Sequence, residues 1–195
     1  EVYIIGNPPY LGARLQDKDQ KSDMETAFCD AVSYSNLDYI GLWFYKAATY
    51  ISQSNCFASS AFVSTNSISQ GEQTAILWPS VFNLGIEIGF VHQNFKWENN
   101  AKNNAVVMCV IIGLRKINEQ SPKKIYQDGL VHTAKNICPY LVDGTNDVVS
   151  KRSKPLSDVP PICFGSMPND GGNLLLTAEE AAGLIDRDIS TKQLI

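Results

Sequence analysis

A short apolar run that stops at two consecutive prolines places the strongest constraint on how this chain folds. Val2–Gly6 is apolar and rich in β-branched residues, and Asn7-Pro8-Pro9-Tyr10 follows it directly. Proline fixes its own φ and has no N–H, so two in a row can neither continue a central strand nor lie inside a helix. The sequence therefore predicts a buried strand that ends in a loop over residues 7–10.

Strand-like and helix-like segments alternate over the next hundred residues. Apolar spacing predicts helices over residues 23–32, 38–51 and 72–82, the last of them ended or bent by Pro79. Apolar runs predict strands over residues 56–64, 85–92 and 105–114, with a polar loop over 95–104 before the last strand. That last strand is apolar on both faces, which is typical of a central strand. The alternation predicts an α/β domain with a mainly parallel sheet.

The character of the chain changes after Arg115. Gly, Pro, Asp and Asn become more frequent, and strand signals shorten to residues 124–126, 130–133 and 147–150. This change predicts a boundary near residue 116. We therefore expect a first domain over 1–115 and a mixed α+β segment over 116–195.

Composition excludes several classes of protein. Of the 195 residues, 44% are hydrophobic and 18% are charged, as in an ordinary globular protein rather than a disordered or fibrous one. No apolar run reaches the roughly 18 residues that a membrane span needs. Five widely spaced cysteines without a CxxC pair argue against a disulfide framework and structural zinc, and fit a reducing cytoplasm. His92 and His132 have no partners at ligand spacing, so no metal site is expected.

The start of the chain and its charges give two further expectations. The chain opens inside an apolar strand, without Met or a signal peptide, so we expect it to be a fragment of a longer polypeptide. The net charge of −4 argues against a uniformly basic nucleic-acid-binding protein. Between Arg115 and Lys154, however, eight Lys or Arg residues accompany only four Asp or Glu residues. Such a basic strip is compatible with phosphate contacts, although a solvated loop explains it more simply.

The loop over residues 7–10 has the groups that methylation of an exocyclic amine requires. The lone pair of adenine N6 is delocalised into the ring, so the amine is a poor nucleophile until two acceptors engage its N–H bonds. The Asn7 side-chain oxygen and the Pro8 carbonyl can supply these acceptors, and Pro9 helps to fix the loop so that both oxygens point one way. Tyr10 offers a flat face on which a base flipped out of the duplex can stack.

Several sequence segments resemble a known family. Gly6-Asn7-Pro8-Pro9-Tyr10-Leu11-Gly12-Ala13-Arg14 resembles motif IV of the γ-type amino-methyltransferases, and more narrowly the fused restriction–modification enzymes of the MmeI kind and their YeeA-like relatives. Further segments agree with these enzymes, and the resemblance covers nearly the whole chain: Leu37-Asp38-Tyr39, Trp43-Phe44-Tyr45-Lys46-Ala47, residues 62–73, Phe95-Lys96-Trp97-Glu98-Asn99 and residues 168–174.

The resemblance implies a fold and a set of site residues. The fold is the C-terminal half of a Rossmann-like, S-adenosylmethionine-dependent methyltransferase sheet. Asn7, Pro8, Pro9 and Tyr10 form the site for the target amine, and a second aromatic residue stacks on the other face of the base. Phe95 and Trp97 both suit that role, and the larger ring favours Trp97. Ser64, Thr65 and Asn66 end the next strand and are expected to border the pocket, although their residue types also suit an ordinary turn.

The resemblance also implies partners. The main S-adenosylmethionine-binding loop of such enzymes precedes Asn-Pro-Pro-Tyr, so we expect it to lie outside this chain, which would be inactive alone. Residues from about 116 onward correspond to the start of a target-recognition domain for double-stranded DNA. Lys151, Arg152 and Lys154 are its local candidates for phosphate contacts. The oligomeric state cannot be read from the sequence.

Two alternatives to adenine-N6 methylation of DNA stay open. Asn-Pro-Pro-Tyr also serves enzymes that methylate a glutamine side chain of translation release factors. Those enzymes should end soon after the last core strand, whereas this chain continues with a basic tract. The second alternative is a non-catalytic DNA-binding or scaffold module on a methyltransferase fold, and the intact Asn7-Pro8-Pro9-Tyr10 argues against it.

Overall fold

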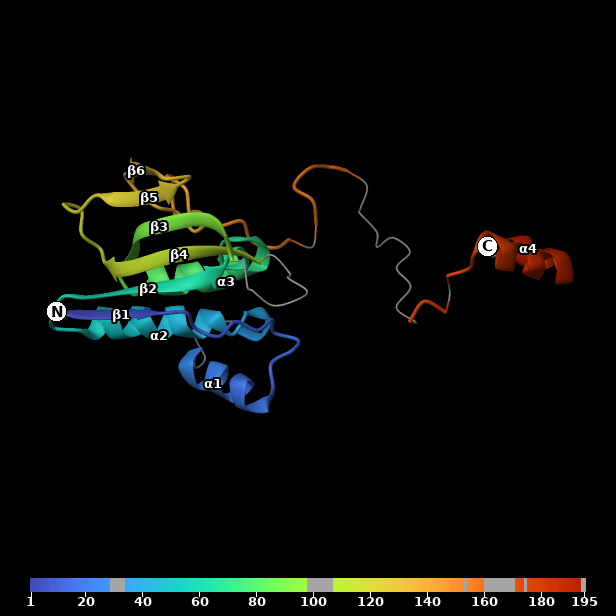
Figure 1. The fold of residues 1–195 in the computed structure, drawn as a ribbon, viewed down its shortest axis with the longest axis horizontal. Helices are drawn as coiled ribbons and strands as arrows, with labels where there is room; N and C mark the ends of the chain where they lie inside the picture. Colours follow the sequence, from blue (N-terminus) through green and yellow to red (C-terminus); the bar gives the residue numbers. More distant parts are fainter. Residues whose placement is uncertain (29–33, 98–106, 153, 160–170, 174, 194–195) are drawn as a thin grey trace. The chain divides into compact units, whose positions relative to one another are not determined.

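The computed structural model of the chain describes residues 1–28, 34–97, 107–152, 154–159, 171–173 and 175–193. These residues form two compact units, one over Glu1–Lys151 and one over Arg152–Ile195. The first unit contains the sheet and three of the helices (Figure 1). The second contains α4, over Ala178–Arg187, which begins with a reciprocal capping box between Thr177 and Glu180, and a short 3-10 helix over Ile189–Gln193.

The first unit is built on a mixed sheet of six strands in the order β1-β2-β4-β3-β5-β6 (Figure 1). The strands are β1 Val2–Gly6, β2 Ala58–Thr65, β3 Ile86–Trp97, β4 Val107–Lys116, β5 Lys123–Gln127 and β6 Leu130–Ala134. β1 pairs with β2, and β3 with β5, in parallel, whereas the pairs β2–β4, β3–β4 and β5–β6 are antiparallel.

The α/β fold class is confirmed, but the expectation of a mainly parallel sheet is wrong. Parallel neighbours need a crossover of about a dozen residues or more, usually a helix. The connection from β1 to β2 contains helices, whereas β3 ends at Trp97 and β4 begins at Val107. That interval is too short for a crossover, so β4 returns antiparallel to β3 and also lies beside β2. Its apolar residues on both faces indicated a central position correctly, but not a direction.

Helices cover one face of the sheet. α2 (Ile40–Gln53) and α3 (Gly71–Phe82) pack on this face, and α1 (Lys18–Phe28) packs against α2 (Figure 1). Phe44 of α2 meets Phe62 of β2 edge to face, with 5.3 Å between ring centroids. Trp78 of α3 is fully buried and donates from Nε1 to the Ile68 carbonyl at 3.0 Å. Burying each such aromatic side chain contributes about 1.5–3 kcal/mol to folding.

Element boundaries depart from the sequence expectations at three places. α1 begins at Lys18 instead of residue 23, because Asp17 and Gln20 exchange side-chain to backbone bonds of 2.8 and 3.1 Å at its start. By contrast, α3 (Gly71–Phe82) matches its expected range to within one residue, and Pro79 does not end it. β3 extends to Trp97 through a bulge between His92 and Phe95, so residues 95–97 are strand and not loop; the rest of that expected loop lies outside the described residues. Residues 147–150 form no strand.

The expected boundary near residue 116 falls between two strands of one sheet. β4 ends at Lys116, and β5 joins the same sheet by pairing with β3. The compact unit runs on to Lys151. As a division between functional domains, the boundary at 115/116 stays a prediction.

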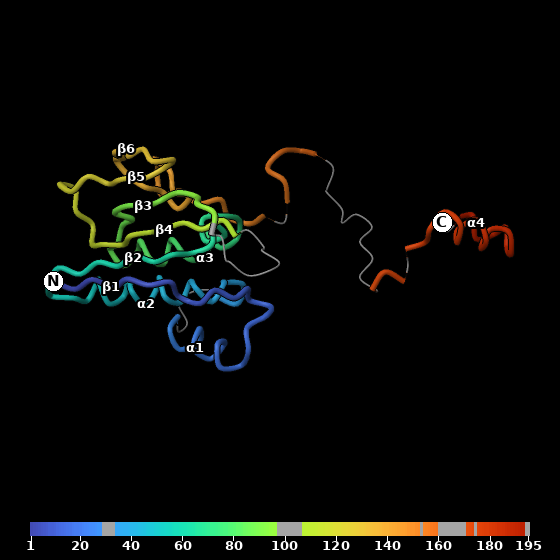
Figure 2. Tube along the Cα trace, in the orientation of Figure 1, coloured from blue at the N-terminus to red at the C-terminus, as the bar shows by residue number. Residues whose placement is uncertain are grey.

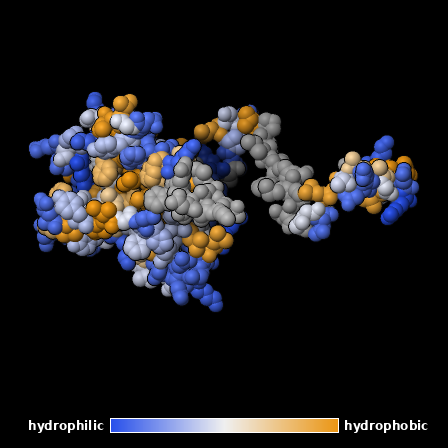
Figure 3. Space-filling view, in the orientation of Figure 1, coloured by the Kyte–Doolittle hydropathy of each residue, from blue (hydrophilic) through white to orange (hydrophobic). Residues whose placement is uncertain are grey.

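The surface of the molecule is chemically mixed. Apolar residues are interspersed with hydrophilic ones over the first unit (Figure 3). Among the described residues, no helix combines the length and apolar composition needed to cross a membrane.

A charged cluster ties β3, β4 and the start of β5 together. The Glu87 carboxylate of β3 forms ion pairs with Arg115, at 2.8 Å from Oε1 to Nε, and with Lys123, at 2.9 Å from Oε2 to Nζ. The Glu87 side chain is only 7% exposed. Arg115 also donates from Nη2 to the Ser121 carbonyl at 2.7 Å. Because both cations share one carboxylate, removal of Glu87 leaves two largely buried positive charges without their partner.

Replacement of Glu87 by alanine is therefore expected to lower the free energy of unfolding by about 3 kcal/mol, because breaking a buried ion pair leaves the charges of its partners uncompensated. Glu72→Ala is the matched control, because Glu72 pairs with Lys151 at 3.6 Å on an exposed surface. Such surface pairs contribute less than about 1 kcal/mol. Chemical denaturation of both variants measures the difference, and equal losses would contradict the assigned role of Glu87.

The contact between α1 and the start of α2 depends on pH. Tyr39, which is 8% exposed, donates its hydroxyl to Asp23 Oδ2 at 2.7 Å. This hydrogen bond, followed by burial, raises the pKa of Tyr39 from 10.0 to about 12. A raised folded-state pKa means that the neutral phenol stabilises the fold fully below pH 10.0, and that this stabilisation is lost as pH rises through about 12.

We expect Tyr39→Phe to lower the free energy of unfolding by about 1.5–3 kcal/mol near neutral pH, the typical contribution of a hydrogen bond to a charged group. The difference from the unsubstituted protein should shrink as pH rises above 10.0 toward 12. Denaturation curves of both proteins at pH 8 and over that interval test this. A difference that stays constant with pH would rule out the phenol as its source.

Candidate active site at the carboxyl edge of the sheet

The Asn7–Tyr10 loop lies at the carboxyl end of β1, as the sequence predicts, but β1 is an edge strand with exposed Tyr3 and Ile5 side chains and not the expected buried strand. β1 ends at Gly6, and the chain leaves the sheet there (Figure 2). Pro8 is buried, whereas Asn7 and Pro9 are exposed and Tyr10 is 41% exposed. Among the described residues, the Asn7 side chain has no hydrogen-bond partner. Pro8 thus anchors the loop, while the amide and the phenol ring stay accessible.

The parallel pairing of β1 with β2 brings a second predicted segment to the same edge. Gly6 pairs with Phe62, and β2 continues to Thr65. Ser64 Oγ donates to the Thr65 carbonyl at 3.0 Å, Thr65 Oγ1 lies 2.6 Å from Ser67 Oγ, and Ser69 Oγ donates to Asn66 Oδ1 at 2.9 Å. Ser64, Thr65 and Asn66 therefore shape a turn beside the loop. Their role at a pocket border stays a prediction.

The end of β3 reaches this edge as well. Phe95 pairs with Cys109 of β4, and Cys109 pairs with Thr65 of β2, so the three lie in one row across the sheet. The half-buried Phe95 meets the edge of the His92 ring, with centroids 5.6 Å apart. The backbone of Trp97 ends β3, and its side chain lies outside the described residues. Burial raises the pKa of the Cys109 thiol, which disfavours its thiolate form.

A carboxylate that sequence reasoning did not select holds the end of the loop. Asp38 Oδ1 accepts from the backbone N–H of Leu11 at 2.9 Å and from that of Ile40 at 3.1 Å. The Leu11 carbonyl accepts from Tyr39 N at 3.0 Å and from Gln16 Nε2 at 3.0 Å. The sequence offered two signals, the family-like segment Leu37-Asp38-Tyr39 and the place of Asp38 at the start of a predicted helix, where it suits a cap, and neither reveals Leu11 as its partner.

The three candidate DNA-contacting cations are exposed but belong to different parts of the structure. Lys151 closes the first unit and forms the 3.6 Å pair with Glu72 at the start of α3. Arg152 and Lys154 are exposed residues of the second unit. Within the described ranges, no group of His, Cys, Asp and Glu side chains is arranged to hold a metal ion.

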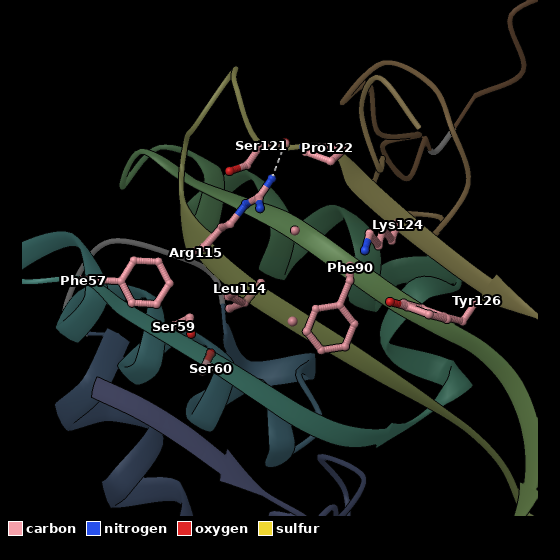
Figure 4. Close-up of a pocket in the computed structure, with 12 residues that line it drawn as sticks. Phe57, Ser59, Ser60, Phe90, Leu114, Arg115, Ser121, Pro122, Lys124 and Tyr126 are labelled. Carbon is pink, nitrogen blue, oxygen red and sulfur yellow. Dashed lines mark hydrogen bonds between the residues drawn. The ribbon is translucent and has the colours of Figure 1, made fainter. Parts of the chain in front are cut away.

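A separate hollow lies on the face of the sheet away from α2 and α3 (Figure 4). It has a volume of about 370 Å³, and its walls include Phe57, Ser59, Phe90, Arg115 and Tyr126. The Phe90 ring lies flat over Gly113, where any side chain would collide with it. Ser59 is near the start of β2, whereas Thr65 ends it, and six residues of strand span roughly 20 Å. The hollow is therefore separate from the candidate site.

The arrangement at the carboxyl edge can present acceptors to an amine. An accessible amide on a proline-fixed loop offers a side-chain oxygen beside a backbone carbonyl, and Tyr10 adds an exposed aromatic face. Ligands of open α/β sheets bind at this end of the strands. None of these groups needs to be charged in order to act.

Comparisons with known proteins agree with this geometry. The family model of the MmeI DNA-methyltransferase domain matches residues 1–127, and that of the MmeI target recognition domain matches residues 143–195. DNA methyltransferase A of Bacillus subtilis (strain 168) is 50% identical over 187 residues, which make up 96% of this chain and 21% of that protein.

A solved structure of the type IIL restriction-modification enzyme MmeI in complex with DNA matches 98% of this chain and 26% of that one, with a TM-score of 0.87 and 42% identity. The chain thus spans only about a fifth to a quarter of these relatives. The resemblance found in the sequence is confirmed. Because the methyltransferase-domain model matches more than half of its residues, the chain belongs to the MmeI family of DNA methyltransferases.

Proposed function

We propose that this chain is the part of a site-specific DNA methyltransferase that holds the target base, and that the complete enzyme methylates N6 of adenine. The observation that carries the proposal is the Asn7–Tyr10 loop, whose amide and aromatic ring are accessible at the carboxyl end of β1. Its occurrence in an MmeI DNA-methyltransferase domain supports a nucleic-acid substrate over a release-factor glutamine or a catalytically inert scaffold.

The chain's own residues act by orientation. The Asn7 side-chain oxygen and the Pro8 carbonyl accept the two N–H groups of adenine N6, which localises the nitrogen lone pair away from the ring. Tyr10 stacks on the extruded base. The proline-fixed backbone keeps both acceptors in place before the base arrives, so little reorganisation accompanies the reaction. The amine nitrogen would then form its bond to the methyl carbon while the bond between that carbon and the sulfonium sulfur of the donor breaks, with its electron pair staying on sulfur, and a proton would leave the nitrogen afterwards to water.

The cofactor in this proposal is S-adenosylmethionine, which supplies an electrophilic methyl group when bound. The described residues of this chain fit the amine end of such a site. Family membership supports the cofactor, while its main binding loop is expected in a part of the protein that precedes Asn7.

Double-stranded DNA is the proposed partner. The match of residues 143–195 to a target recognition domain supports this partner, as does the DNA complex of the structural relative. Lys151, Arg152 and Lys154 are proposed to contact phosphates, because all three are exposed cations within the matched region. The cytoplasm stays the proposed location.

The decisive experiment uses the full-length protein with S-adenosylmethionine and duplex DNA of mixed sequence, followed by mass spectrometry of the nucleosides. N6-methyladenine should form, and Asn7→Ala should lower kcat by about 10²–10³, the typical loss on removing one preorganised hydrogen-bonding group. Asn83→Ala is the matched control, because Asn83 is an exposed asparagine at the end of α3. Formation of N5-methylglutamine in a release factor, without any methylated DNA, would overturn the substrate assignment.

A second experiment separates the two aromatic candidates. We propose that Trp97 stacks on the base, since the Phe95 ring already packs against His92. Base stacking on an aromatic residue contributes about 1–3 kcal/mol, so Trp97→Ala should lower kcat/KM by roughly 5- to 150-fold. Phe95→Ala should have a smaller effect. The reverse order of losses would assign the stacking role to Phe95.

A further inference from the structure

We propose that Asp38 is a positioning residue for the Asn7–Tyr10 loop and that Gln73 couples this loop to the start of α3. The inference rests on the proposed function, because it assigns the group that orients the target-amine site. Asp38 lies just before α2 and is half-buried. It touches neither the expected substrate nor the reacting atoms, and it acts through the backbone of Leu11.

The first step is the restriction of the loop from both sides. The rings of Pro8 and Pro9 lock their own φ angles. Immediately after Tyr10, the Leu11 N–H donates to Asp38 Oδ1 at 2.9 Å, and the Leu11 carbonyl receives Tyr39 N at 3.0 Å. Tyr10 is therefore the single residue between a proline pair and a clamped peptide. The backbone on both sides of Tyr10, and with it the direction of the loop, is restricted by these two constraints.

The second step is the way in which Asp38 itself is held. Asp38 Oδ1 also accepts from the Ile40 N–H at 3.1 Å, so one oxygen binds both the loop and the first turn of α2. The N-terminus of a helix favours an acceptor or negative charge at this place. Since both bonds are made to Oδ1, the geometry requires an acceptor there, and an asparagine can provide one.

The third step connects the loop to the neighbouring strand end. Asp38 N–H donates to Gln73 Oε1 at 2.8 Å, and Gln73 Nε2 donates to the Asn36 carbonyl at 2.7 Å. Gln73 belongs to the first turn of α3, and the short helix over Asn66–Ser69 links α3 to the end of β2. One glutamine amide thus fixes the segment that carries Asp38 relative to the turn beside the Asn7–Tyr10 loop.

This arrangement predicts a loss of turnover without a loss of DNA binding. Without the Oδ1 acceptor, the Leu11 peptide is released and the two acceptors for the amine lose their fixed direction. A misplacement of about 1 Å can lower the rate about 100-fold. Ground-state binding of DNA uses other contacts, so KM should change little.

The experiment compares Asp38→Ala, Asp38→Asn and Gln73→Ala in the full-length protein, with kcat and KM measured on duplex DNA. We expect Asp38→Ala to lower kcat by about 10- to 100-fold with KM within about threefold of its original value. Asp38→Asn should restore most of kcat, because it retains the acceptor. Gln73→Ala should give a smaller loss, which is not additive with that of Asp38→Ala.

Asp23→Ala is the matched control. It removes a carboxylate that accepts a hydrogen bond from the hydroxyl of Tyr39, the residue after Asp38, at 2.7 Å. It leaves intact the hydrogen bonds of the Leu11 N–H to Asp38 and of the Leu11 carbonyl to the Tyr39 N–H. It should therefore lower stability without lowering kcat per folded molecule. The fluorescence of 2-aminopurine at the target position adds a second measurement: Asp38→Ala should extrude the base but show an altered signal, which a purely structural loss would not produce.

The outcomes separate the two proposals. Equal kcat values for Asp38→Ala and Asp23→Ala, or no rescue by Asp38→Asn, would overturn the positioning role. If Asp38→Ala does not fold, an unchanged kcat in Gln73→Ala overturns the coupling, and a reduced kcat at unchanged KM supports it. If the unsubstituted protein forms no N6-methyladenine, or if Asn7→Ala stays active, the proposed function itself fails.

Discussion

The parallel pairing of β1 with β2 is the constraint on which the rest of the site depends. Parallel neighbours require a crossover connection. Residues 7–57 must therefore leave the sheet at the carboxyl end of β1 and return to the opposite end of the sheet, where β2 begins. The crossover carries α1 and α2, and it brings Asp38 beside Leu11 at the end of the loop. The same pairing places the end of β2 next to the Asn7–Tyr10 loop. Without it, neither the carboxylate nor the second strand end would meet the loop.

The antiparallel half of the sheet complements this arrangement. β4 lies between β2 and β3 and aligns Thr65, Cys109 and Phe95 in one row, which brings the end of β3 to the edge that carries the loop. Toward the other end of β4, the Glu87 cluster joins three strands through one carboxylate. The end of the sheet that carries the Asn7–Tyr10 loop thus has accessible polar and aromatic groups. At the other end, the charged side chains of the Glu87 cluster form ion pairs with one another.

The sequence predicted those features whose cause is local. Two prolines restrict their own φ angles, so the end of β1 and the loop followed from four residues, and the family resemblance extended that interpretation. The start of α1 was missed because Asp17 and Gln20 cap a polar helix without a clear apolar period. The extension of β3 was missed because a bulge interrupts its alternation after His92.

Features set by distant partners could not be predicted from the sequence. The direction of β4 depends on how short its connection to β3 is, and the apolar pattern is the same for either direction. Asp38 and Leu11 are 27 positions apart, so their hydrogen bond depends on the completed crossover. Likewise, the coupling of Asp38 to Gln73 exists only once α2 and α3 pack on the same face.

The proposed role of the loop after β1 is to receive the target amine. A crystal structure of the full-length protein, bound to duplex DNA and to a non-reactive analogue of S-adenosylmethionine, tests this claim most directly. We expect an adenine turned out of the duplex, with N6 about 3 Å from both the Asn7 side-chain oxygen and the Pro8 carbonyl oxygen. A base that remains stacked in the duplex, or an extruded base whose N6 lies away from both oxygens, would contradict it.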